Sequence, residues 1–111
     1  MCTLSWVYHG NNHYEVYFNR DEQRSRLPAL EPQSLVIDGV HCVMPIDPVG
    51  GGSWISANEH GVTVCLLNFY QGKTPKGPLT SRGMIIKRRA SSCSSQTVDA
   101  RLLEMELTHF A

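Results

Sequence analysis

The fold depends on the opening stretch MCTLSWVYHGNNHYEVYFNRDE, residues 1–22. Residues 2–8 and 13–18 are rich in β-branched and aromatic side chains with a partial two-residue alternation, which predicts two strands. Between them, HGNN at residues 9–12 contains Gly and Asn, which tolerate the positive φ of a tight turn. We therefore predict an antiparallel hairpin, whose second strand brings NRDE at residues 19–22 next to the start of the chain.

Working outward, the next predicted unit is a second hairpin. Residues 24–33 contain two prolines, several charges and little periodicity, so we expect a surface loop there. Short apolar runs at residues 35–37 and 40–44 flank Asp38-Gly39, a strong signal for a two-residue hairpin turn. This pair should form two more antiparallel strands.

A glycine-rich segment leads into the last predicted strands. Three glycines at residues 50–52 allow the backbone to approach a ligand or another segment closely. Residues 54–57 and 62–68 are predicted strands, and the second is apolar enough to be buried on both faces. A loop rich in Gly, Pro and Lys is expected at residues 71–79.

The remaining chain has the pattern of two helices. Residues 84–90 suit a helix that Thr80 or Ser81 could cap, and Thr97 is the expected cap of a second helix at residues 98–109. Strands followed by a helical pair predict an α+β fold, with antiparallel sheets and a helical layer.

Composition narrows the class of protein. The 111 residues suggest one domain, and 41% hydrophobic with 18% charged residues predicts a packed core. Ten basic and ten acidic residues give zero net charge, which argues against a nucleic-acid partner. We expect a cytoplasmic protein, because the sequence has neither a secretory signal nor an apolar run of membrane-spanning length. Its four cysteines lack a C-x-x-C pair, so reduced thiols are expected rather than a zinc site. A homo-oligomer could cover an exposed sheet edge.

The residues that could carry chemistry are Cys2, Arg20, Asp21 and Asn68. A small residue at position 2 allows removal of Met1, which would leave a thiol and a free α-amine on Cys2. Such an amine titrates at about pH 8 and can act as the base for its own side chain. Asp21 could hold the ammonium, Arg20 could favour the thiolate, and the Asn68 amide could stabilise an oxyanion. An ordinary solvated turn explains the charges at residues 20–22 equally well. Cys2 indicates a nucleophile only in combination with the other candidate residues.

Several motifs in register along the chain resemble the NRDE family, also called the Transport and Golgi Organisation 2 family. These motifs are MCT at residues 1–3, NRDE at 19–22, Asp47 before GGSW at 51–54, Asn68 after an apolar strand, and SRG at 81–83. The resemblance implies an αββα sandwich like that of the N-terminal-nucleophile hydrolases. Residues 1–111 would be the N-terminal half of that domain, as a piece of a longer protein or as a truncated homologue, with strands at about 2–68 and helices at about 81–109.

The start of the chain and residues 61–69 are also similar to the choloylglycine hydrolases. That resemblance implies Cys2 as nucleophile, Asp21 and Arg20 as its supports, and Asn68 in the oxyanion hole. In those enzymes two residues separate the Arg from the Asp, whereas Arg20 and Asp21 are adjacent here.

The resulting hypothesis is an N-terminal cysteine hydrolase that acts on the C–N bond of a small-molecule amide, without a cofactor. The alternative is a non-catalytic carrier or interaction protein of the haem-trafficking, lipid or Golgi-organisation type, with haem as cargo held by Cys2 or a histidine. His9 and His13 straddle the first turn, so structural roles are expected for them rather than a helical metal pair.

Overall fold

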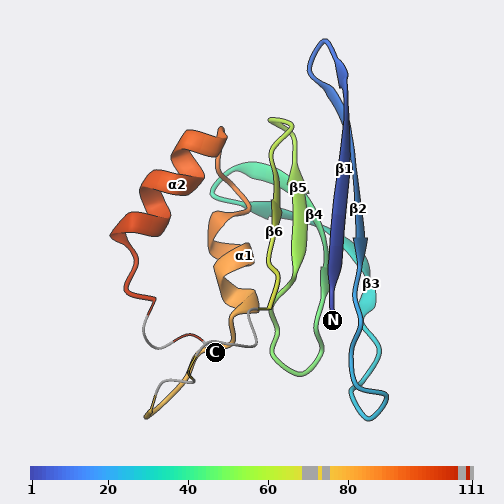
Figure 1. Cartoon of the computed structure of the whole chain (residues 1–111). Coiled ribbons are helices and arrows are strands. Elements are labelled where there is room, and N and C mark those ends of the chain that lie inside the picture. The colour runs from blue at the N-terminus through green and yellow to red at the C-terminus, as the bar shows by residue number, and fades with distance from the viewer. Residues whose placement is uncertain (69–72, 74–75, 108–109, 111) are drawn as a thin grey trace.

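The structure, a computed structural model, describes residues 1–68, 73, 76–107 and 110. Two antiparallel sheets precede two short helices, which confirms the predicted α+β class (Figure 1). One sheet has two strands and the other has four, in the order β3-β4-β5-β6. The elements are β1 (Thr3–Gly10), β2 (His13–Asn19), β3 (Leu30–Ile37), β4 (Val40–Ile46), β5 (Ile55–Asn58), β6 (Thr63–Cys65), α1 (Gly83–Arg89) and α2 (Ser95–Glu104).

The predicted first hairpin is confirmed. β1 pairs with β2 from Thr3 opposite Asn19 to Tyr8 opposite Tyr14, and the register shifts only near the turn. Asn11 and Asn12 have φ values of 52° and 60°, the left-handed conformation that asparagine tolerates better than most residues. Because directly opposite residues project to the same face, the even-numbered residues of both strands share one face of the hairpin.

The second hairpin is also confirmed, although its first strand starts earlier than predicted. Asp38 and Gly39 form the turn with φ values of 49° and 77°. β3 already begins at Leu30, so the predicted loop at residues 24–33 is wrong in its second half. Pro32 is tolerated because β3 is an edge strand, and the register shifts between Leu30 and Gln33.

The last strand of the four-stranded sheet differs most from prediction. β6 comprises only Thr63–Cys65, and all three residues are partly exposed, so the expectation of a long strand buried on both faces is wrong. Apolar character alone could not reveal that a cavity runs beside this strand. The predicted loop at residues 71–79 lies largely outside the described residues.

The helices occur where they were predicted, but both capping predictions are wrong. α1 begins at Gly83 after Arg82, and none of the described side chains caps it. α2 begins at Ser95, because the Ser94 hydroxyl accepts a hydrogen bond from the Thr97 N–H at 3.1 Å. It ends at Glu104; of the predicted extension to residue 109, residues 108 and 109 lie outside the described part of the chain.

The molecule has three layers, with the helices on one side of the four-stranded sheet and the β1–β2 hairpin on the other (Figure 1). The main buried cluster consists of Cys42, Met44 and Ile46 from β4 together with Ala90 at the end of α1. It therefore fills the space between the sheet and the helices. Asn58 strengthens this junction, since its side-chain amide donates to the carbonyls of Ala90 and Ser92 at 2.8 and 2.7 Å.

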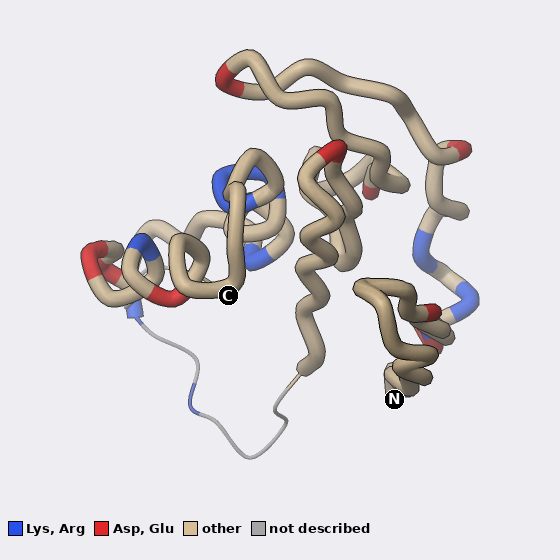
Figure 2. Tube along the Cα trace, turned by 90° about the horizontal axis from the view of Figure 1, so that it is seen from above, with Lys and Arg blue, Asp and Glu red and all other residues tan. Residues whose placement is uncertain are grey.

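Charged residues are dispersed over the molecule. Basic and acidic residues lie on several separate segments of the trace rather than on one face of the molecule (Figure 2). Within the described part of the chain, neither helix is long and apolar enough to cross a membrane.

Candidate active site at the base of the first hairpin

Three of the four predicted site residues line one small pocket. Cys2, Arg20 and Asn68 meet in a cavity of about 140 Å³ at the open end of the β1–β2 hairpin. The other lining residues come from five separate segments: Glu22, Arg26, Asp47, Gly52, Ser53, Trp54, Leu66, Ser81, Arg82 and Gly83. All the motifs that carried the family resemblance therefore contribute to one site.

The hairpin register explains why Cys2 and Arg20 meet. The last regular pair is Thr3 opposite Asn19. Continuing that register by one residue places Cys2 opposite Arg20, and residues opposite each other in an antiparallel ladder share a face. The predicted return of the second strand to the start of the chain is therefore confirmed.

Asp21 points elsewhere, because neighbouring residues on an extended chain project to opposite sides. Its carboxylate accepts a hydrogen bond from the α-amine of Met1 at 2.7 Å, and the Asp21 side chain is 72% exposed. The Met1 ammonium lowers the pKa of Asp21, first through the hydrogen bond and then through its charge. The expected contact between Asp21 and the chain's start is present, but Asp21 lines a neighbouring open cavity with Met1, Asn68 and Arg82.

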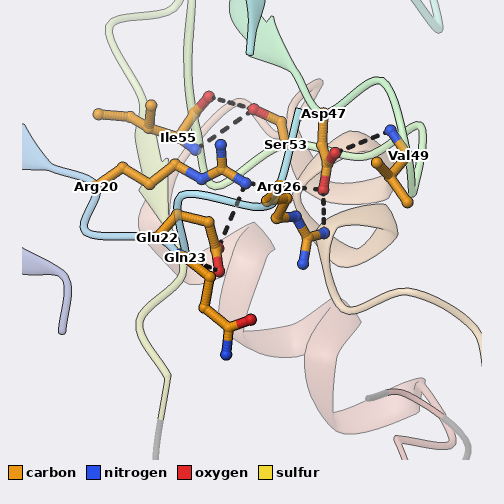
Figure 3. A network of polar contacts seen from close by, with 8 residues as sticks. All are labelled: Arg20, Glu22, Gln23, Arg26, Asp47, Val49, Ser53 and Ile55. Carbon is orange, nitrogen blue, oxygen red and sulfur yellow. Dashed lines mark hydrogen bonds and ion pairs between the residues drawn. The ribbon is translucent and has the colours of Figure 1, made fainter. Parts of the chain in front are cut away.

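Arg20 is held in a defined position. Its guanidinium lies 4.1 Å from the centre of the Trp54 ring, a distance suited to a cation–π interaction. Nη2 lies 3.5 Å from Glu22 and 3.8 Å from Asp47, and the side chain is only 18% exposed (Figure 3). A largely desolvated cation is therefore fixed in the wall of the pocket.

Asp47 is the anionic centre of this wall. Its side chain is 10% exposed, accepts a 2.5 Å hydrogen bond from Arg26 and accepts another from the Val49 N–H at 2.9 Å (Figure 3). Burial raises the pKa of Asp47, but the Val49 N–H and the Arg26 guanidinium outweigh it, so the pKa lies below its ordinary value. The carboxylate stays ionised and binds two arginines.

The predicted close backbone approach occurs at Gly52. A Cβ there would lie 2.6 Å from the Gly83 Cα, and the Ser53 N–H donates to the Gly83 carbonyl at 3.1 Å. Only glycines permit the segments 51–54 and 81–83 to cross at this distance. This crossing joins the start of α1 to the pocket and explains why both motifs contain glycine.

Asn68 follows the sheet rather than ending a strand. β6 stops at Cys65, but the Leu66 N–H donates to the Trp54 carbonyl at 2.9 Å, which keeps the chain beside the pocket. Asn68 then lines both the Cys2 pocket and the cavity near Asp21.

Arg26 is the site residue that sequence reasoning missed. It lies in the segment predicted to be a surface loop, and its partner Asp47 is 21 positions away in the sequence. The signal that could have found it is the cluster of three arginines at positions 20, 24 and 26 close to a motif that contains an acidic residue.

Among the residues that the structure describes, no histidine lines this pocket. His9 and His13 stack near the hairpin turn with ring centroids 4.9 Å apart, and His9 contacts Glu15 at 2.7 Å. Among the described residues, His, Cys, Asp and Glu side chains form no group of three that could hold a metal ion.

The fold and the pocket together define an α+β protein that places a cysteine near its N-terminus beside a fixed arginine and an asparagine. The chain belongs to the Transport and Golgi organisation 2 family, whose family model matches residues 1–109. Searches of curated proteins and of solved structures gave no significant match.

Proposed function

We propose that this chain is an N-terminal cysteine amidohydrolase, in which Cys2 attacks the carbonyl carbon of a small amide. The observation that carries the proposal is the meeting of Cys2, Arg20 and Asn68 in one pocket, with Asp21 bound to the amine that begins the chain. Amide hydrolysis by an N-terminal cysteine needs a nucleophile, a cation, an amide hydrogen-bond donor and a carboxylate that binds the terminal ammonium.

Removal of Met1 would convert the Cys2 nitrogen into the free base. Asp21 already binds the ammonium of the preceding residue at 2.7 Å, so we propose that it would bind the new amine of Cys2 in the same way. Its carboxylate would then orient the amine and stabilise the ammonium that forms during the reaction. Asp21 is thus a positioning residue in this scheme.

The reaction would proceed in two halves. The amine takes the Cys2 proton, Sγ bonds to the substrate carbonyl carbon, and the carbonyl electrons move to oxygen. The C–N bond then breaks, and the ammonium returns the proton to the leaving amine. A water molecule, deprotonated by the same amine, attacks the thioester and releases a carboxylic acid and the thiol.

Arg20 and Asn68 would stabilise the negative charges that develop during the reaction. A guanidinium never loses its proton in proteins, so Arg20 would supply a permanent positive charge in the pocket that Cys2 also lines. The Asn68 amide can donate to the oxyanion, an interaction whose loss typically costs about a hundredfold or more in rate.

The test is site-selective alkylation with iodoacetamide between about pH 6 and about pH 8, read out by peptide mass mapping. Cys93 is exposed and its pKa is lowered, mainly by the hydrogen bond from Thr97, so it competes for the reagent. The experiment therefore uses a Cys93→Ala background. Protein with Met1 removed should be labelled at Cys2 faster than protein with an added N-terminal extension, and faster than at Cys42 or Cys65.

Two controls sharpen the result. Arg20→Lys keeps the charge but cannot reproduce the planar contact with Trp54, and Arg20→Met removes the charge at similar length. We expect Cys2 labelling to fall most in Arg20→Met. If intact mass shows that Met1 stays on, or if Cys2 reacts no faster than Cys65, the hydrolase proposal is wrong.

A further inference from the structure

We propose that Arg82 binds a carboxylate of the substrate, so that the site takes a short acidic amide rather than a neutral one. This inference rests on the proposed function, because it places the scissile amide of that substrate beside Cys2. Arg82 lines the Cys2 pocket and also the neighbouring cavity near Asp21. It belongs to the SRG motif at residues 81–83, and no step of the proposed reaction uses it.

The charged residues of the pocket are paired, except for Arg82. Three arginines and two acidic residues line the pocket. Asp47 contacts Arg26 at 2.5 Å and lies 3.8 Å from Arg20. Glu22 lies 3.5 Å from Arg20. Within the part of the chain that the structure describes, the Arg82 side chain has neither a hydrogen-bond partner nor an ion-pair partner. The pocket therefore carries one positive charge that none of the described side chains balances.

The neighbouring cavity, of about 460 Å³, does not balance this charge either. Its lining includes two carboxylates, those of Glu22 and Asp21, and Asp21 already binds the Met1 ammonium at 2.7 Å. The two cavities share Glu22, Asn68 and Arg82, so they adjoin at these residues. An anion bound by Arg82 would therefore lie at the same junction as Asn68, the candidate oxyanion donor.

The backbone on both sides of Arg82 is held in place. The Gly83 carbonyl accepts a hydrogen bond from the Ser53 N–H at 3.1 Å. On the other side, a Cβ at Gly50 would lie 2.8 Å from the Ser81 hydroxyl oxygen, so Ser81 packs directly against the glycine-rich segment. Arg82 itself remains exposed between these two packed neighbours. Its side chain can thus contact a ligand at the pocket without any change in the fold.

A carboxylate is the anion that suits this cation and this volume. A guanidinium presents parallel N–H donors that match the two oxygens of a carboxylate. The Cys2 pocket, at about 140 Å³, is close in volume to a cavity of about 150 Å³ that holds one benzene molecule, or roughly six non-hydrogen atoms. It has room for an amide group and only a few more atoms. The carboxylate of the substrate therefore lies only a few bonds from the scissile carbonyl.

Two alkylating reagents of nearly equal size test the charge preference. Iodoacetate carries a carboxylate and iodoacetamide a neutral amide, and both can alkylate Cys2 whether or not the chain hydrolyses amides. In the Cys93→Ala background, the ratio of the iodoacetate to the iodoacetamide rate constant should be higher at Cys2 than for free N-acetylcysteine. That ratio should fall about tenfold in Arg82→Gln, as loss of a hydrogen bond between charged groups would give. An unchanged ratio in Arg82→Gln would overturn the proposal.

Arg88→Gln is the matched control. It also removes one positive charge from α1, but Arg88 is not among the described residues that line the pocket, and its guanidinium lies over the Phe110 ring. The ratio should stay close to the wild-type value in Arg88→Gln, because salt screens an exposed charge at a distance. Equal losses in the two variants would contradict a local carboxylate site. Thermal melting checks that both variants are folded.

Protection of Cys2 shows which side of the amide bears the carboxylate. Succinamate carries it on the acyl side and N-acetylglycine on the amine side, and succinamide and N-acetylglycinamide are their neutral counterparts. At least one of the two acids should slow alkylation of Cys2 by iodoacetamide in a saturable manner, with an apparent Kd about tenfold higher in Arg82→Gln. Equal protection by an acid and its neutral counterpart, or no protection by either acid, would overturn the proposal.

Turnover of the same four amides separates this proposal from the hydrolase proposal. Protection of Cys2 by an acid that is not hydrolysed would support the carboxylate site at Arg82 and refute the enzyme. Hydrolysis of an acid and its neutral counterpart with equal kcat/KM, unchanged in Arg82→Gln, would support the enzyme and refute the carboxylate site.

Discussion

Replacing Asp47 by Asn tests the ion-pair network that forms the wall of the candidate site. The substitution keeps the shape of the side chain but removes the charge that binds Arg26 and faces Arg20. A hydrogen bond to a charged group contributes about 1.5 to 3 kcal/mol. Arg26 is 38% exposed and can partly return to water, so we expect the lower part of that range, about 1.5 to 2 kcal/mol.

Urea unfolding followed by tryptophan fluorescence measures this loss. With a slope of roughly 1.5 kcal/mol per molar, the midpoint for Asp47→Asn should fall by about 1 M. Asp47→Ala should fall further, because it also leaves the Val49 N–H without its acceptor. Glu22→Gln is the control, since Glu22 is more exposed and lies 3.5 Å from Arg20, and it should shift the midpoint little.

The stabilisation that the Asp47 charge provides should be lost at low pH. The pKa of Asp47 is lower in the folded state than the unfolded value of about 3.9, so its charge stabilises the fold above that pH. The difference between wild type and Asp47→Asn should be constant at neutral pH and decrease as pH falls through the lowered pKa. An unchanged midpoint for Asp47→Asn at neutral pH would refute the view that this network holds the pocket together.

Three further predictions concern separate parts of the molecule. Gly52→Ala should lower the melting temperature by about 5 °C or more, because its Cβ would overlap the Gly83 backbone, and overpacking of this kind typically costs about 1 to 3 kcal/mol. An unchanged melting temperature would contradict the close crossing of the two segments. Tyr14→Phe should reduce stability by about 1 kcal/mol and speed amide hydrogen exchange in the first hairpin, because the Tyr14 hydroxyl hydrogen-bonds to the second sheet's Gly61 carbonyl. Equal exchange rates in the two proteins would contradict this role of the hydrogen bond. Cys93 should react with iodoacetamide faster than Cys42, and the ratio of the two rates should increase at lower pH, because the pKa of Cys93 is lowered and burial raises the pKa of Cys42. Reaction of Cys42 at an equal rate would contradict its burial.

Local signals predicted most of the elements correctly. The Asn11-Asn12 and Asp38-Gly39 turns have the left-handed φ values that their residue types tolerate. Both helices lie where the sequence predicted them, but their first residues are displaced, since capping depends on which hydroxyl reaches a free N–H. The extent of β6 was predicted wrongly because it pairs with β5 only over Thr63–Cys65, and apolar character does not reveal how much of a segment finds a pairing partner.

Local chemistry was sufficient to predict that the end of the first hairpin returns to Cys2, because strand pairing and a tight turn leave one register. Contacts between segments that are distant in the sequence could not be predicted in this way. The Arg26–Asp47 pair and the crossing of Gly52 with Gly83 both depend on how the layers are placed. Each joins segments that no short-range propensity connects, so packing of the whole chain was needed to reveal them.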